Sequence, residues 1–140
     1  MAQLDDVIRS SPIAVSRERY AVVRLAEPCP LGDHFLVCRD ADETTLISPE
    51  ALVPWEAALA TETWFRLLAI RMATPFATPG FLARVASALA QRGINVYVVS
   101  TFSKDCVLLK EEDLEEGVAA LAAIGFPIVP VPADRSAETT

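Results

Sequence analysis

Residues 72–126 read MATPFATPGFLARVASALAQRGINVYVVSTFSKDCVLLKEEDLEEGVAALAAIGF, and this stretch decides the fold. Its apolar residues change from helical spacing to strand-like runs and back, with glycines at the breaks. The predicted order is strand, helix, strand, strand, helix, strand, with a hairpin corner at residues 100–105. This order predicts a split β-α-β unit, in which one sheet is covered by two helices.

The first helix of this unit is marked by one apolar stripe, made of Phe81, Leu82, Val85, Ala86 and Leu89. We expect Thr78 to cap it and Pro79 to occupy its first position, where the missing N–H has no intrahelical partner. Gly93 is expected to end it in a left-handed conformation. Strands follow over residues 95–101 and 106–110.

The second helix is predicted to start near Glu112 or Asp113, because acidic side chains favour the positive end of a helix. Gly125 should stop it. A last strand over residues 126–131 carries two prolines, which is typical of an edge strand.

The first half of the chain contains shorter elements. Strands are predicted over residues 20–25, 35–39, 44–47 and 64–72, a helical turn over 4–8, an extended piece over 13–15, and a helical pattern over 55–60. A shift of 62 positions lays residues 38–47 over 100–109, matching two hairpins with acidic corners. This predicts an internal duplication whose first copy lacks a full helix between Leu25 and Phe35, although two half-buried hairpins could match by chance. The strands would form two sheets or one continuous eight-stranded surface.

The composition favours a globular protein and excludes several partners. The 140 residues are 52% hydrophobic and 22% charged, with a net charge of −7, so a nucleic acid or an anionic membrane is not an expected partner. No window approaches the ~20 apolar residues of a membrane span. The N-terminus has no apolar signal core, so we expect a cytoplasmic protein.

No catalytic set or metal site is expected. Cys38 and Cys106 lie in strand-like runs and are predicted to be small buried hydrophobes, and no disulfide is implied. His34, Cys29 and Cys38 match no zinc spacing. The acidic run at residues 111–116 is typical of a solvated helix start. We therefore predict no enzyme, no cofactor and no metal ion.

The turn made of Thr78, Pro79, Gly80 and Phe81 is the first candidate binding segment. Glycine allows a close approach of a ligand, and the free N–H groups of a first helical turn attract a carboxylate. The alternative is a capped helix with close strand packing.

The corner carrying Ser100, Thr101, Phe102 and Asp105 is the second candidate segment. Asp105 could accept a charge-assisted hydrogen bond from an α-amino or guanidinium group, Thr101 offers a hydroxyl, and Phe102 offers a flat wall. Within one unit the corner and the helix turn need not lie at the same end of the sheet, but across a dimer or between the two repeats the corner can be brought against the helix turn of a neighbour. Alternatively, Asp105 bonds its own turn.

These segments, together with residues 89–94, 99–105 and 108–114, resemble the ACT-domain family. More closely, they are similar to the bacterial tandem-ACT proteins related to the CASTOR arginine sensors. The resemblance implies an α+β fold of two ferredoxin-like βαββαβ subdomains in tandem, the first abbreviated. It divides the chain into a degenerate N-terminal subdomain (1–63), a C-terminal ACT subdomain (64–132) and a flexible tail (133–140).

The resemblance also implies a function. ACT domains are regulatory modules that bind amino acids at interfaces between paired domains, so we expect a non-catalytic amino acid sensor. It would form a homodimer and could act on a protein partner. The alternative is a ligand-free module of the same fold that serves only dimerisation or protein interaction.

Overall fold

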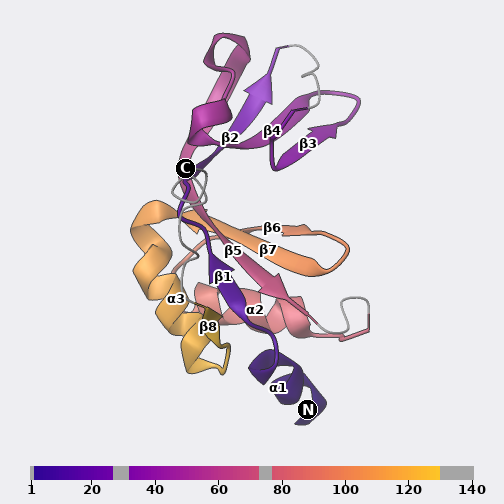
Figure 1. Ribbon diagram of the computed structural model, residues 1–140, viewed down its shortest axis with the longest axis vertical. Coiled ribbons are helices and arrows are strands. Elements are labelled where there is room, and N and C mark those ends of the chain that lie inside the picture. The colour runs from indigo at the N-terminus through magenta and orange to yellow at the C-terminus, as the bar shows by residue number, and fades with distance from the viewer. Residues whose placement is uncertain (1, 27–31, 73–76, 130–140) are drawn as a thin grey trace, which may run out of the picture.

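The computed structural model describes residues 2–26, 32–72 and 77–129 (Figure 1). Its helices are α1 (Ala2–Arg9), α2 (Phe81–Ala90) and α3 (Leu114–Ala123), with short 3-10 turns η1 (Glu50–Leu52), η2 (Trp55–Ala57) and η3 (Glu111–Asp113). Its strands are β1 (Ile13–Val15), β2 (Tyr20–Leu25), β3 (Leu36–Arg39), β4 (Thr44–Pro49), β5 (Ala58–Arg71), β6 (Tyr97–Ser100), β7 (Lys104–Lys110) and β8 (Ile128–Val129). The expected tail at 133–140 and Cys29 lie outside the described residues.

All eight strands belong to one continuous sheet, as one of the two sequence-based alternatives predicted. β5 runs through both halves of it. The first part of β5 pairs with β2, which continues to β4 and β3, while its second part pairs with β7 and with β1. β1 also pairs in parallel with β8 and so lies between β5 and β8. Figure 1 shows the sheet bent into an upper and a lower half, both built on β5.

The lower half has the βαββαβ order, namely β5, α2, β6, β7, α3 and β8. Its main core lies between the sheet and the helices and contains Ile8, Leu68, Ile70, Val85, Leu89, Val107, Leu109 and Leu121. Ile8 comes from α1, so the N-terminal helix packs on this half. β5 continues past residue 63, and the division into subdomains 1–63 and 64–132 stays a prediction.

The two glycine stops were predicted correctly. Gly93 has φ +71°, and Ile94 N–H donates to Leu89 O at 3.1 Å, which closes the end of α2. Gly125 has φ +116°, and Phe126 N–H donates to Leu121 O at 3.2 Å after α3.

The helical pattern predicted over residues 55–60 was wrong. Only η2 is helical there, and β5 begins at Ala58. Edge-to-face contact of Trp55 with Trp64, at 5.9 Å between ring centroids, holds this segment against β5. Val53, which precedes this segment, packs in the small upper core with Ala21, Val23, Leu25 and Leu46.

The two hairpins have matching turns, but their registers differ by one residue from the predicted shift of 62, and the internal duplication stays a prediction. Arg39 pairs with Thr44 in the upper hairpin, and Ser100 pairs with Asp105 in the lower one, so equivalent positions are 61 apart. The turns agree, since Asp40 N–H donates to Glu43 O and Thr101 N–H donates to Lys104 O. The apolar pattern could not fix this register because β7 is buried on both faces over residues 106–109.

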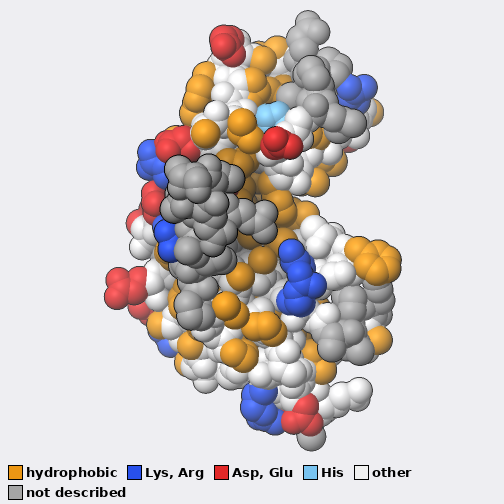
Figure 2. All heavy atoms as spheres, viewed as in Figure 1, with side chains coloured by type: hydrophobic (Ala, Val, Ile, Leu, Met, Phe, Trp, Pro, Cys, Tyr) orange, Lys and Arg blue, Asp and Glu red, His pale blue; other side chains and the backbone are white. Residues whose placement is uncertain are grey.

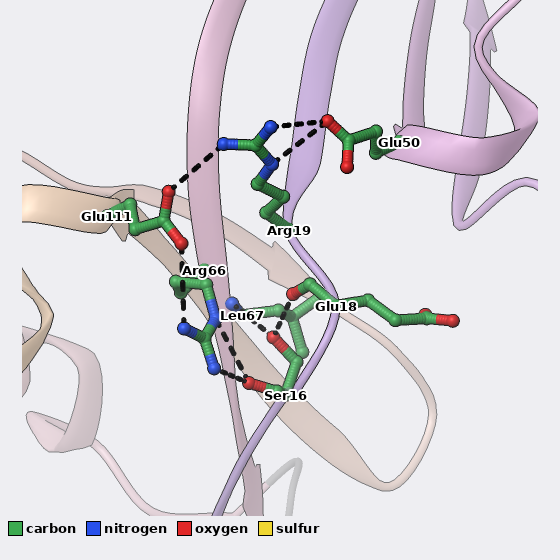
Figure 3. Close-up of polar contacts among 7 residues, drawn as sticks. All are labelled: Ser16, Glu18, Arg19, Glu50, Arg66, Leu67 and Glu111. Atoms are coloured by element: carbon green, nitrogen blue, oxygen red, sulfur yellow. Dashed lines mark hydrogen bonds and ion pairs between the residues drawn. The ribbon is translucent and has the colours of Figure 1, made fainter. Parts of the chain in front are cut away.

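A polar cluster lies where the two halves meet (Figure 3). The Arg19 guanidinium donates twice to Glu50 Oε2, at 2.9 and 2.6 Å, and its Nη1 lies 3.6 Å from Glu111 Oε2. It also lies 4.3 Å from the centre of the Trp64 ring. Arg66 reaches the other Glu111 oxygen at 3.7 Å and donates to Ser16 O. These contacts join β5, η1, η3 and the β1–β2 connection at one place.

Apolar side chains also join the halves on the sheet face that the helices leave uncovered. Ile47 of the upper half belongs to one cluster with Phe65, Leu67, Cys106 and Leu108. Figure 2 shows hydrophobic side chains gathered in the notch between the halves.

We predict that Leu68→Ala lowers the free energy of unfolding by about 2–5 kcal/mol, because Leu68 is fully buried beneath the helices. Leu59→Ala is the matched control, since Leu59 is 59% exposed on the same strand and should change stability by less than about 0.5 kcal/mol. Urea denaturation of both variants measures the difference. Equal losses would contradict the assigned core.

Candidate functional site

A hollow of about 380 Å³ lies between the start of α2 and the hairpin of β6 and β7. Its lining joins both predicted segments and consists of Met72, Thr78, Gly80, Phe81, Leu82, Ala83, Ser100, Thr101 and Asp105. All these residues belong to the second half of one chain. The two segments therefore meet within one chain, without a dimer or a contribution from the first repeat.

The helix turn has a different cap from the one predicted. α2 begins at Phe81, and its N-cap is Gly80 at φ +85°, with no side-chain cap hydrogen bond. Thr78 is therefore not the cap, and Pro79 is not the first helical residue. Phe81 N–H donates to Thr78 O at 3.4 Å, which closes a four-residue turn with Gly80 at its third position. Gly80 has a left-handed conformation there, which only glycine adopts freely.

Gly80 has no side chain that could accept a hydrogen bond from the first turn of α2, which borders the hollow. The first N–H groups of a helix have no intrahelical acceptor, and the helix dipole adds positive potential there. Leu82 and Ala83 of the first turn line the hollow. Neither residue was among the predicted site residues, although any helix start exposes the N–H groups of these positions.

The turn is held in place by α1. A Cβ added at Gly80 would lie 3.8 Å from Leu4 Cδ2, and Arg84 of α2 forms a 2.7 Å ion pair with Asp5. Phe81 is 2% exposed and packs edge-to-face on Phe126 at 5.6 Å between centroids. The N-terminal helix thus contributes to the position of the α2 turn.

Asp105 provides the negative charge of the hollow. It is 8% exposed, and Ser100 Oγ donates to its Oδ1 at 2.8 Å. Asp105 therefore bonds a neighbour in its own hairpin, as the alternative interpretation expected, and it lines the hollow as well. A buried carboxylate beside a helix N-terminus offers acceptors and donors to one small molecule.

Two predicted site residues do not line the hollow. Pro79 is exposed at the outer side of the turn. Phe102 is 81% exposed at the tip of the hairpin. Met72, which is 5% exposed at the end of β5, lines the hollow and was not predicted. Its place follows from the pairing of β5 with β7, which the sequence pattern did not specify.

Cys38 lies on β3, His34 just before that strand, and Cys106 on β7. Cys106 is buried, as predicted, but Cys38 is exposed on β3, which corrects the prediction that both are buried. His34 Nδ1 lies 2.9 Å from Ser48 Oγ. Within the described ranges, no group of three or more His, Cys, Asp or Glu side chains is arranged to hold a metal ion.

The two thiols should differ in reactivity. Burial raises the pKa of the Cys106 thiol, and Asp105 raises it further against the opposing effect of Lys104. In a Cys29→Ser background at neutral pH, we expect one fast-reacting thiol, which Cys38→Ser removes, and one slow thiol, which Cys106→Ser removes. Labelling with a chromogenic disulfide measures both rates. A fast Cys106 would contradict its burial.

Comparison with known proteins agrees with this architecture. Residues 60–123 match the family model described as ACT domain. No protein of curated function matches the sequence. None of the helices in the described part of the chain has the length and apolar character needed to cross a bilayer.

Solved structures with a similar fold include two whose function is not stated. Protein Atu0741 from Agobacterium tumefaciens is 26% identical, with a TM-score of 0.69 over 85% of this chain and 92% of that one. VC0802 from Vibrio cholerae, described as a possible transport protein of unknown function, is 16% identical, with a TM-score of 0.74 over 89% of this chain and 97% of that one.

A third similar structure is the regulatory subunit of aspartate kinase from Thermus thermophilus, in a ligand-free form. It is 14% identical, with a TM-score of 0.60 over 84% of this chain and 97% of that one. Residues 60–123 of the chain therefore match the ACT-domain model, and the mixed α+β fold is the ferredoxin-like ACT fold found in regulatory domains of aspartate kinases.

Proposed function

We propose that this protein is a non-catalytic regulatory module that binds a free amino acid in the hollow between the α2 turn and Asp105. The single observation that carries this proposal is the meeting of a helix N-terminus and a buried carboxylate in one hollow of about 380 Å³. The zwitterion of an amino acid carries a carboxylate and an ammonium group on the same carbon atom. These two groups complement the helix N-terminus and the carboxylate of Asp105.

The α-carboxylate is proposed to bind the backbone N–H groups of the first turn of α2. Gly80 has no Cβ, so a ligand oxygen can approach the backbone closely. Its left-handed conformation turns the chain into the helix at this point. Anion binding at such a helix start needs no basic side chain.

The α-amino group is proposed to donate to Asp105. Ser100 bonds one oxygen of this carboxylate, which fixes its orientation and leaves lone pairs for an ammonium group. Charge-assisted hydrogen bonds of this kind are stronger than neutral ones, and the low exposure of Asp105 reduces competition from water. The ligand side chain would contact Met72 and Leu82.

Ligand binding in the hollow can affect the contacts between the two halves of the sheet through β7. This strand starts at the hollow and ends at Lys110, whose Nζ lies 2.7 Å from Thr63 O. The next residue, Glu111, contacts Arg19 and Arg66. A ligand that favours one arrangement of the halves would shift the population toward it.

The protein is proposed to act as a cytoplasmic homodimer, with a protein partner as the possible recipient of the signal. Exposed apolar side chains on and beside the edge strand β6 support an association surface, namely Tyr97, Val98 and Phe102. The same observation favours the second candidate function, a ligand-free module for dimerisation or protein interaction. A specific relation to the tandem-ACT proteins near the CASTOR arginine sensors also remains a proposal.

A thermal-shift screen with the twenty amino acids at millimolar concentration tests the function. A ligand present at about 100 times its Kd should raise Tm by roughly 10 °C, because it binds only the folded state. Asp105→Asn keeps the shape and removes the charge, so it should abolish this rise.

Asp113→Asn is the matched control, because it removes the same charge at the start of a helix away from the hollow. It should retain the full rise. If no amino acid shifts Tm while analytical ultracentrifugation finds a dimer that Phe102→Ser weakens, the ligand-free module is the better account.

A further inference from the structure

Two basic side chains face each other across the strands on the other side of the sheet. Arg71 of β5 is the direct antiparallel partner of Lys104 of β7. Both line a second hollow of about 190 Å³ together with Pro12, Ala14, Ala69 and Val129. No acidic residue is part of this lining.

This arrangement is unfavourable without a counter-charge. Like charges directly opposite each other in an antiparallel pair destabilise it. The chain has 19 acidic and 12 basic residues, so acidic partners are abundant. Six other basic residues have acidic partners, namely Arg9, Arg19, Arg66, Arg84, Arg92 and Lys110. The described residues Arg17, Arg24 and Arg39 also form no ion pair, but none of them has a second basic side chain directly opposite in a strand pair. Within residues 2–26, 32–72 and 77–129, Arg71 and Lys104 form no ion pair.

The surroundings suit a bound anion. The four other lining residues are apolar and small or medium in size, so they leave space above the sheet and do not compete for hydrogen bonds. The guanidinium of arginine can bind two oxygens of a planar or tetrahedral oxyanion at once. An ammonium group on the neighbouring strand adds a second charge. Figure 2 shows a patch of basic side chains on the lower half of the face turned to the viewer.

We infer that the hollow lined by Arg71 and Lys104 is an anion site for a small ligand that carries a carboxylate or phosphate group on an apolar body. The site is separate from the proposed amino acid site and does not depend on it. Lys104 and Asp105 are adjacent in β7, and successive side chains of a strand point to opposite faces. The two hollows therefore lie on opposite sides of the same strand end, and binding at one can influence the other through the hairpin.

Melting of the full chain in inorganic phosphate and in acetate, each compared with sodium chloride at equal ionic strength, tests the inference. Equal ionic strength removes general screening as a cause. We expect Tm to rise by roughly 3 °C or more over chloride, and Arg71→Gln and Lys104→Gln should each remove most of this rise. A response to phosphate alone identifies a phosphate ligand, and a response to acetate as well identifies a carboxylate.

Arg39→Gln is the matched control, since Arg39 ends β3 on the surface and has no ion pair in the described part of the chain. It should keep the full response. Without added anion, Lys104→Gln should melt at or above the temperature of the unchanged protein, because repulsion is removed. The Arg71 Nε–Hε NMR signal should shift saturably with the active anion.

An equal effect of chloride, or a rise that survives both substitutions, would overturn the inference. Neither result would bear on the amino acid site, because its test depends on Asp105→Asn. Conversely, loss of the amino acid response alone would leave the anion site standing.

Discussion

The structure depends on the pairing of one long strand, β5, with partners from both ends of the chain. Its first part hydrogen-bonds to β2, and its second part lies between β1 and β7. Without β5, the lower half would be left with two separate strand pairs, β1 with β8 and β6 with β7, and an isolated pair of strands is at best marginally stable. Because one strand serves both halves, a change in its direction moves them relative to each other. The contacts of Arg19 and Glu111 lie at the point where such movement would occur.

The site follows from this sheet. β7 pairs with β5 over seven residue pairs, and this register sets the position of Asp105 along the sheet. α2 is fixed by its apolar face on the same strands, which sets the position of Gly80. The hollow is the space left where the helix start and the hairpin do not touch. Its two charges are therefore held by secondary structure and not by a loop, which reduces the ordering cost of binding.

Much of the lower half could be predicted because its signals are local. Gly93 and Gly125 end helices, and the apolar stripe of α2 has a clear helical period. The cap of α2 was predicted wrongly, since both Thr78 and Gly80 suit a helix start and the conformation of the turn decided between them. The hairpin residues that line the hollow, namely Ser100, Thr101 and Asp105, were predicted. Met72 was not, because its place beside them depends on the register of β5 with β7.

Other features depend on contacts far apart in the sequence. The three residues of β1 pair with β5 and β8, which lie more than fifty positions away in the sequence. So short a segment has no apolar pattern that indicates which strands it pairs with. The repeat register was also ambiguous, because a strand buried on both faces does not distinguish a shift of 61 from one of 62. The cross-strand pair of Arg71 and Lys104 likewise appears only once β5 and β7 are aligned.

The most direct measurement for the central claim is a crystal structure of the protein grown with the amino acid that stabilises it best. The account predicts the ligand between α2 and the β6–β7 hairpin, with its carboxylate at the backbone of residues 80–83 and its amino group on Asp105. An amino acid bound elsewhere, or an empty hollow closed by neighbouring side chains under saturating ligand, would contradict it.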